Sequence, residues 1–156
     1  MSELREVPAH DPQLVQLVTA QQDEVATRYG NIDDHGGAQP PLHADTIWLL
    51  LLHDGQPAGC AALQPLSHTD PTAAPDTGEV KRLYVAPDHR GQGLSKMLMA
   101  GVEASARIAG YRDLQLETGL RQPEALALYR QSGWTQITPY GHYRSSALSV
   151  SFAKSL

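Results

Sequence analysis

The sequence predicts a single α/β domain built around a mixed, mostly antiparallel sheet. Strand-like and helix-like patterns follow one another along the chain in the order β-α-α-β-β-β-α-β-α-β-β. The 156 residues, 41% hydrophobic and 19% charged, match the size and composition of one ordinary globular domain. No internal repeat or linker interrupts the pattern, so we expect one domain over residues 1–156.

The N-terminal third is expected to contain short strands and a helical region. Asp11 followed by Pro12 is typical of a helix start, because aspartate caps exposed N–H groups and proline fits the first turn. A second helical stretch is expected at 23–29. Strands are expected at 4–7, 46–53 and 58–66, a loop at 30–42 and a hairpin turn at 54–57.

The rest of the chain alternates strands with helices. Strands are expected at 78–85, 111–118, 134–138 and 148–154, and helices from Leu94 to Ile108 and at 123–132. The last strand alternates leucine, valine and phenylalanine with small residues, which is typical of a half-buried strand. In the strand 78–85, period-2 geometry predicts two faces, one with Glu79, Lys81, Leu83 and Val85 and the other with Val80, Arg82 and Tyr84.

A glycine-containing loop, Arg90-Gly91-Gln92-Gly93-Leu94-Ser95, lies between the strand 78–85 and the helix that begins at Leu94. Backbone N–H groups at a helix start and the helix dipole favour an anion there, most naturally a phosphate. Lys96 stands where the dinucleotide fingerprint has its third glycine, and the Gly-Lys-Ser/Thr of a P-loop is absent.

This loop resembles the pyrophosphate loop of the GNAT superfamily of acyl-CoA-dependent N-acyltransferases. The family signature is Arg or Gln, two residues, Gly, one residue, then Gly or Ala. Arg90 and Gly93 match it, and Ser95 departs from its last position only by a small residue, so close packing remains possible there. A second family pattern, Ala-x-x-Leu-Tyr-x-x-x-Gly-Phe, is matched by Ala125, Leu128, Tyr129, Gly133 and Trp134. The two matches span residues 77–135. One departure is that Arg121-Gln122 stand where many members carry an asparagine before the second helix.

The resemblance implies that acetyl-CoA is the co-substrate. Its pyrophosphate would lie on the glycine loop, and its pantetheine arm would pair with the main chain of the preceding strand. The implied cofactor-binding residues are Leu83, Tyr84, Val85, Arg90, Gly91, Gln92, Gly93, Leu94 and Ser95.

The resemblance also implies two catalytic residues. Tyr129 occupies the position of the family's tyrosine that protonates the coenzyme A sulfur, and a phenol holds its proton at neutral pH. The alternative for Tyr129 is ring packing on the sheet. Glu79 begins the strand before the glycine loop, where many members have a carboxylate base. Its alternative role is a structural ion pair with Lys81 or an arginine.

The segment 139–146 is expected to border the acceptor pocket, by resemblance to the family. The candidates for acceptor contact are Tyr140, His142, Tyr143 and Arg144. An Arg144 contact would suggest a carboxylate on the acceptor, as in an amino acid. The alternative is a surface hairpin with ordinary aromatic packing.

Composition narrows the partners. A net charge of −5 without a basic cluster argues against nucleic-acid binding. The longest apolar run, Ile47–Leu52, is too short to cross a membrane. The histidines lack metal-ligand spacing, so no metal is expected. The single cysteine, Cys60, lies in an apolar strand as a small hydrophobe, and one cysteine makes no internal disulfide, which favours a reducing cytoplasm.

The expected function is therefore transfer of an acetyl group from acetyl-CoA directly to the primary amine of a small molecule or amino-acid-like acceptor. Acetylation of a protein lysine or N-terminus is the competing enzymatic function, and a non-catalytic acyl-CoA sensor is the competing binding function. Homodimers are common in the family, although nothing in the sequence requires one.

Overall fold

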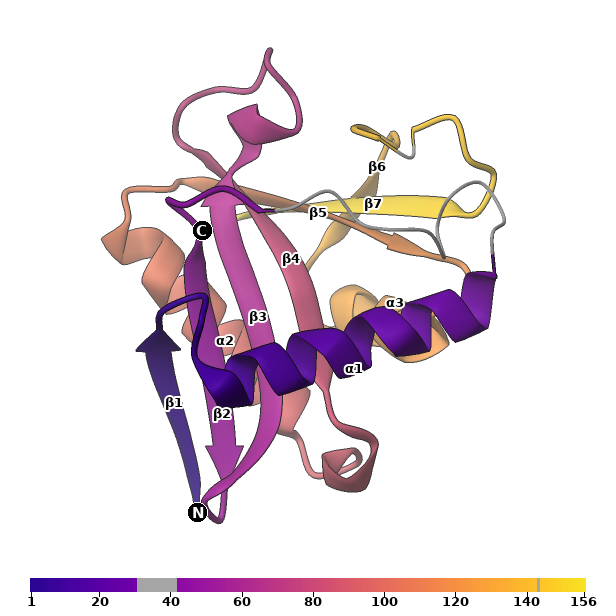
Figure 1. Cartoon of the computed structure of the whole chain (residues 1–156). Helices are drawn as coiled ribbons and strands as arrows, with labels where there is room; N and C mark the ends of the chain where they lie inside the picture. Colours follow the sequence, from indigo (N-terminus) through magenta and orange to yellow (C-terminus); the bar gives the residue numbers. More distant parts are fainter. Residues whose placement is uncertain (31–41, 143) are drawn as a thin grey trace.

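A computed structural model describes residues 1–30, 42–142 and 144–156 of the chain. A seven-stranded sheet has the strand order β1-β2-β3-β4-β5-β7-β6, with α1 on one face and α2 and α3 on the other (Figure 1). The strands are β1 (Ser2–Val7), β2 (Ile47–His53), β3 (Gln56–Pro65), β4 (Thr77–Val85), β5 (Asp113–Gly119), β6 (Thr135–Ile137) and β7 (Ser149–Ser155), and the α-helices are α1 (Pro12–Tyr29), α2 (Leu94–Ile108) and α3 (Pro123–Gln131). Two short 3-10 helices, η2 (Leu66–His68) and η3 (Pro87–His89), precede and follow β4. No helix in the described ranges has both the length and the hydropathy needed to cross a membrane.

Helix α1 is continuous, so the expectation of two separate helical segments before residue 30 is wrong. The Asp11 side chain accepts hydrogen bonds from the N–H groups of Gln13 and Leu14, as expected for a helix N-cap. Leu14 and Leu17 pack against the β2 and β3 residues of one sheet face, including Trp48 and Cys60. Residues 19–23 contain no glycine or proline, which explains why the helix does not stop there.

Helices α2 and α3 cover the opposite face and enclose the larger core. Leu98, Met99 and Val102 of α2 pack with Leu116 of β5 and Phe152 of β7. Because these side chains are almost completely excluded from solvent, each contributes roughly 1.5–3 kcal/mol of transfer free energy. This packing fixes the beginning of α2, and with it the glycine loop, against the end of β4.

Strands β4 and β5 are parallel, whereas every other neighbouring pair in the sheet is antiparallel. Their pairing covers only Thr77–Val80 with Asp113–Leu116. Beyond these residues the two strands separate, and their backbone groups are no longer paired with each other. The separation opens the centre of the sheet at the carboxyl ends of both strands.

An extra residue in β4 alters the predicted side-chain alternation. Opposite the two steps from Cys60 to Ala62, β4 takes three steps from Tyr84 to Lys81. Arg82 lies in this bulge with φ of +56°, a conformation that side chains rarely adopt. Val80 therefore packs on the α2 face and Tyr84 on the α1 face, contrary to the prediction that they share a face.

Two further local expectations need correction. The hairpin between β2 and β3 turns through Asp54 and Gly55 alone, both with positive φ, because an Asp-Gly pair suits a two-residue turn. Strand β7 was predicted to be half-buried, yet its serines Ser149 and Ser151 are also buried. The reason is that β7 lies between β5 and β6 inside the sheet.

Candidate active site

A cavity lies between the end of β4, the glycine loop and the beginning of α3. Its lining contains every sequence-predicted cofactor residue except Gln92: Leu83, Tyr84, Val85, Arg90, Gly91, Gly93, Leu94 and Ser95. Gln122, Glu124, Ala125 and Leu128 from the α3 side, together with Glu24 and His89, complete it. Gln92 belongs to the same loop but is exposed.

The glycine loop presents the beginning of α2 to this cavity. Gly93, the N-cap of α2, has φ of +77° and no side chain that caps the first turn. This backbone conformation is readily available only to glycine. The uncapped N–H groups and the positive end of the helix dipole therefore favour an anion at this end of the cavity.

Arg90 is engaged within the protein rather than pointing freely into the cavity. Its Nε donates to the carbonyl of Val85 at 2.9 Å, and its Nη2 lies 2.9 and 3.0 Å from the two carboxylate oxygens of Glu24. The guanidinium also lies 5.6 Å from the centre of the Tyr84 ring. The sequence-predicted phosphate contact of Arg90 stays a prediction, while its contacts connect the glycine loop to α1.

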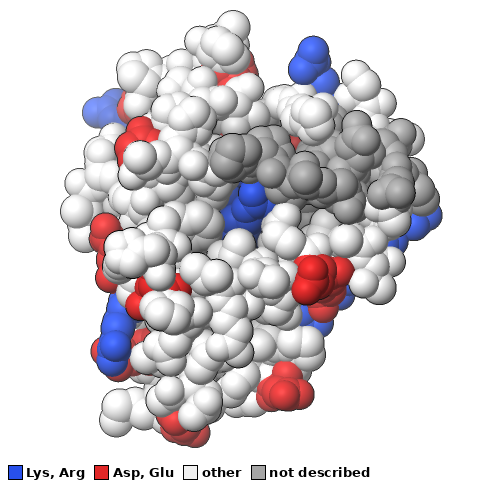
Figure 2. Space-filling model, viewed as in Figure 1, with Lys and Arg blue, Asp and Glu red and all other residues white. Residues whose placement is uncertain are grey.

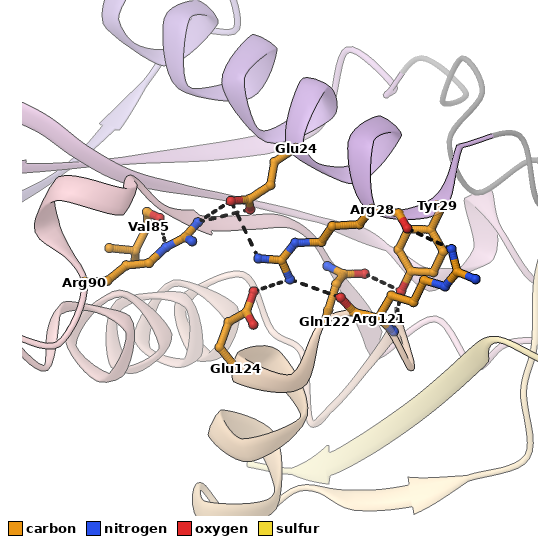
Figure 3. Close-up of polar contacts among 8 residues, drawn as sticks. All are labelled: Glu24, Arg28, Tyr29, Val85, Arg90, Arg121, Gln122 and Glu124. Atoms are coloured by element: carbon orange, nitrogen blue, oxygen red, sulfur yellow. Dashed lines mark hydrogen bonds and ion pairs between the residues drawn. The ribbon is translucent and has the colours of Figure 1, made fainter.

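Charged side chains continue this connection from α1 to α3 (Figure 3). Arg28 of α1 forms ion pairs with Glu24 and with Glu124 of α3. The Arg28 and Arg121 side chains each donate to the other residue's carbonyl, at 3.2 and 3.0 Å. This bridge joins segments more than ninety positions apart, so no local sequence pattern indicates it.

The end of α1 also touches the loop before α3 through Tyr29. Its hydroxyl donates to Gln122 Oε1 and accepts from the Arg121 N–H, both at 3.2 Å. A β-carbon at Gly119 would overlap the Tyr29 hydroxyl, at a distance of 1.8 Å. Gly119 therefore permits the close approach that fixes α1 over the separated strands.

A second cavity lies between α1 and the separated ends of β4 and β5. Its lining comprises Gln21, Gln22, Val25, Glu79, Val80, Lys81, Arg82, Glu117, Thr118 and Gln122. Gln122 lines both cavities, so the two meet at this residue. A compound that enters along the glycine loop and reaches past Gln122 would place its end beside two carboxylates.

Glu79 is almost completely buried in this region, with 2% exposure. Its Oε1 accepts hydrogen bonds from Gln64 Nε2 at 3.0 Å and Thr69 Oγ1 at 2.6 Å, and its Oε2 accepts from the Tyr140 hydroxyl at 2.8 Å. The Lys81 ammonium lies 3.9 Å from Oε1. Both predicted roles, base and structural partner, fit this geometry, although three neutral donors already satisfy the carboxylate.

Glu117 is a candidate that the sequence reasoning missed. Burial raises the pKa of its carboxyl to about 7, opposed by the hydrogen bond from Ser149 Oγ and by Lys81, and supported by the charge of Glu79. A carboxyl with such a pKa exchanges protons near neutrality. The signal in the sequence was the position of Glu117 near the carboxyl end of a strand. Because β5 runs parallel to β4 and Leu116 pairs with Val80, Glu117 lies beside Lys81 along the two strands.

Tyr129, the predicted acid, follows Leu128 in α3, but it lies in the core and is not among the residues that line the first cavity. Its ring packs against Trp134 and Phe152, with ring centres 5.8 and 5.5 Å apart. Burial raises its pKa, so the phenol keeps its proton at any neutral pH. Its catalytic role stays a prediction, because packing explains these contacts equally well.

The four predicted acceptor residues are dispersed. Tyr140 points to Glu79, His142 and Arg144 are exposed, and Arg144 donates to the Gly141 carbonyl at 3.1 Å. Tyr143 lies outside the described residues. Cys60 is buried, and burial raises the pKa of its thiol to about 12, which argues against a covalent acyl-cysteine route.

Comparisons with known proteins agree with the fold. The Acetyltransferase (GNAT) family profile matches residues 12–134. An IAA acetyltransferase from Azospirillum brasilense is 33% identical over 97% of this chain and 95% of its own length. A crystal structure assigned as an acyl-CoA N-acyltransferase from Klebsiella pneumoniae has a TM-score of 0.80 and 30% identity, covering 100% of this chain and 98% of that one. A GNAT acetyltransferase from Elizabethkingia anophelis, solved with acetyl-CoA bound, has a TM-score of 0.69 and 17% identity over 99% and 98% of the chains, a similarity of fold.

Proposed function

The chain belongs to the GNAT acetyltransferase family, and on that premise we propose that it transfers the acetyl group of acetyl-CoA to the primary amine of a small acceptor. The observation that supports this most is the pair of cavities that meet at Gln122. The first offers helix N–H groups for a pyrophosphate, and the second offers carboxylates for a proton. The thioester would lie where the two meet.

Coenzyme A binding is supported by the separation of β4 from β5. Beyond Val80 the edge of β4 is not paired with β5, so main-chain groups at Leu83–Val85 are available to a ligand with amide groups, such as the pantetheine arm, except for the Val85 carbonyl, which accepts from Arg90. Leu83, Ala125 and Leu128 supply apolar contact along the same path. The pyrophosphate would lie at Gly91 and Gly93.

The transfer requires two proton movements. The amine nitrogen attacks the thioester carbonyl carbon, the C–N bond forms, and the C–S bond breaks. We assign acceptance of the amine's proton to Glu117, because its carboxyl lines the second cavity and its pKa lies near neutrality. We assign protonation of the departing thiolate to Tyr129 because it matches the position of the family's tyrosine; burial raises its pKa, so the phenol carries a proton at neutral pH.

Glu79 is the alternative base predicted from the sequence. A comparison of Glu79→Gln with Glu117→Gln separates the two, because the base is the residue whose loss removes the pH dependence of kcat/KM near pH 7. Glu79→Gln also disturbs three hydrogen bonds, so its melting temperature has to be measured alongside.

The proposed activity is tested by thiol release from acetyl-CoA in the presence of small amines, lysine-containing peptides and peptides with free N-termini. Release with small amines supports the proposal, and release with peptides alone supports the protein-acetylating alternative. Coenzyme A that stabilises the protein in a thermal shift, without release for any acceptor, supports the sensor. No stabilisation by coenzyme A or acetyl-CoA contradicts all three.

A further inference from the structure

Two basic residues, Lys81 and Arg82, line the cavity between α1, β4 and β5, and within the described residues no carboxylate oxygen lies at hydrogen-bond distance from the Lys81 ammonium. Lys81 lines this cavity, and its side chain is 27% exposed. Figure 2 shows Lys or Arg atoms in a hollow of the α1 face, with uncharged residues along its lower border. A partly buried ammonium without strong partners is costly, and a ligand that supplies an anion removes that cost.

The contacts of Lys81 within the described residues are weak. Its closest carboxylate oxygen is Glu79 Oε1, at 3.9 Å, which is beyond hydrogen-bond distance. Glu79 itself is held by Gln64, Thr69 and Tyr140. Among the residues that the structure describes, the ammonium makes no hydrogen bond, and Lys81 lines the cavity, so its three N–H donors are available to a ligand there.

Glu117 lines the same cavity, which places a proton acceptor and a cation within reach of one small molecule. An α-amino acid has its amine and its carboxylate two bonds apart. The remaining lining includes the amides of Gln21, Gln22 and Gln122, which suit a polar ligand better than an apolar amine. We infer that the acceptor carries a carboxylate next to its amine, and that Lys81 binds this carboxylate while the amine faces Glu117.

This inference rests on the proposed acetyl transfer and names the class of acceptor. It replaces Arg144, predicted from the sequence as the carboxylate contact, with a residue of β4. Arg144 is exposed and does not line the cavity. Strand alternation alone did not indicate Lys81, because the bulge at Arg82 changes the side-chain facing of β4. Lys81, before the bulge, lines the second cavity, whereas Leu83 and Val85, after it, line the first.

The test uses the proteinogenic L-amino acids and their matching α-carboxamides as acceptors with acetyl-CoA. Because the carboxamides have less basic and intrinsically more available amines, a preference for the acids identifies a bound carboxylate. We expect the wild-type kcat/KM to favour the best acid over its carboxamide by about 10- to 150-fold, the range of a charged hydrogen bond. An equal or reversed preference overturns the inference and leaves the proposed transfer standing.

The variant Lys81→Met should raise KM for the acid by the same factor and leave KM for acetyl-CoA unchanged. Because Lys81 also lowers the pKa of Glu117, the readout is the ratio of kcat/KM for acid and carboxamide within each variant at one pH, and this ratio should fall to about one in Lys81→Met. Lys81→Arg keeps the charge and should retain the acid preference, which separates charge from folding defects. Arg107→Met, an equal loss of charge on an exposed site of α2, should change nothing. An intact acid preference in Lys81→Met overturns the assignment of Lys81.

Absence of thiol release with every acceptor would contradict the proposed transfer, and the inference is then decided by binding. Calorimetry of the same acid and carboxamide pairs with the protein saturated with coenzyme A should show acid binding that Lys81→Met weakens. Equal affinity for acid and carboxamide overturns the inference there too.

Discussion

Replacement of Glu117 by glutamine should change both the pH dependence of the reaction and that of stability. The carboxyl has a folded-state pKa of about 7 against an ordinary value of 4.5, chiefly because it is buried. If Glu117 accepts the amine's proton, wild-type kcat/KM falls about tenfold for each pH unit below 7. Glu117→Gln removes the base, which typically costs 10²–10⁴-fold at pH 8.

The stability effect follows from the same difference in pKa. The folded carboxyl binds its proton more tightly than the unfolded one, so its contribution favours folding below pH 4.5 and is lost as pH rises through 7. The interval of about 2.5 pH units corresponds to about 3.4 kcal/mol at about 1.36 kcal/mol per unit. Solvent screening of a half-buried group reduces this to about 1–2 kcal/mol.

The assay compares wild type with Glu117→Gln at pH 5 and pH 8. The amine's own ionisation affects both proteins equally, so the ratio of their kcat/KM values isolates Glu117. That ratio should shrink by about 100-fold from pH 8 to pH 5, since only about 1% of a group with a pKa near 7 is ionised at pH 5. The variant should also melt about 2–8 °C higher relative to wild type at pH 8 than at pH 4. A constant ratio across this range refutes Glu117 as the base.

Three further predictions concern the cofactor cavity. Tyr129→Phe should lower kcat by about 10–10³-fold with unchanged acetyl-CoA affinity. An unchanged kcat would exclude Tyr129 as the acid, and Tyr111→Phe is the control for loss of a hydroxyl elsewhere. Gly93→Val should weaken coenzyme A binding in calorimetry, whereas Gly110→Val, at a similar positive φ, should cost stability alone; equal affinities contradict the loop assignment. Glu24→Gln removes a carboxylate from the cavity and should tighten coenzyme A about fivefold, or about 1 kcal/mol, with a lower melting temperature from the lost Arg90 contacts. Weaker binding instead would mean that the orientation of Arg90 by Glu24 matters more than charge repulsion.

The glycine loop and the grouping of its neighbours around one cavity were predictable because their determinants are local. The strand before Arg90, the glycine loop and the helix after Gly93 follow one another along the chain, and periodicity with glycine chemistry identifies each. The resulting residue set lines one cavity with Gln92 as its one omission. These local patterns did not predict the contact of Glu24 with Arg90, because Glu24 lies on α1, sixty-six positions away in the sequence.

The acceptor half was less predictable because it depends on pairing between distant strands. The parallel register of β4 with β5 decides which carboxylates share a cavity, and a sequence of alternating residues does not report that register. The bulge at Arg82 is equally hard to predict from the sequence. A single extra residue in the strand moves every following side chain to the opposite face of the sheet. For this reason the period-2 pattern predicted that Lys81 and Leu83 share one face of the strand, whereas they line different cavities in the structure.

The bulge thereby separates two tasks within one strand. Before it, Glu79 and Lys81 face α1 and the second cavity, where charge would select the acceptor. After it, Leu83 and Val85 line the cofactor cavity, where main-chain groups suffice for a pantetheine arm. Contacts made by the main chain persist when the side chain is substituted. The contact between a carboxylate and the Lys81 ammonium is lost when Lys81 is substituted by an uncharged residue. Differences in acceptor among proteins of this fold should therefore concentrate at positions equivalent to Lys81 and Glu117, and Lys81→Met with retained acetyl-CoA affinity would show that the two tasks are independent.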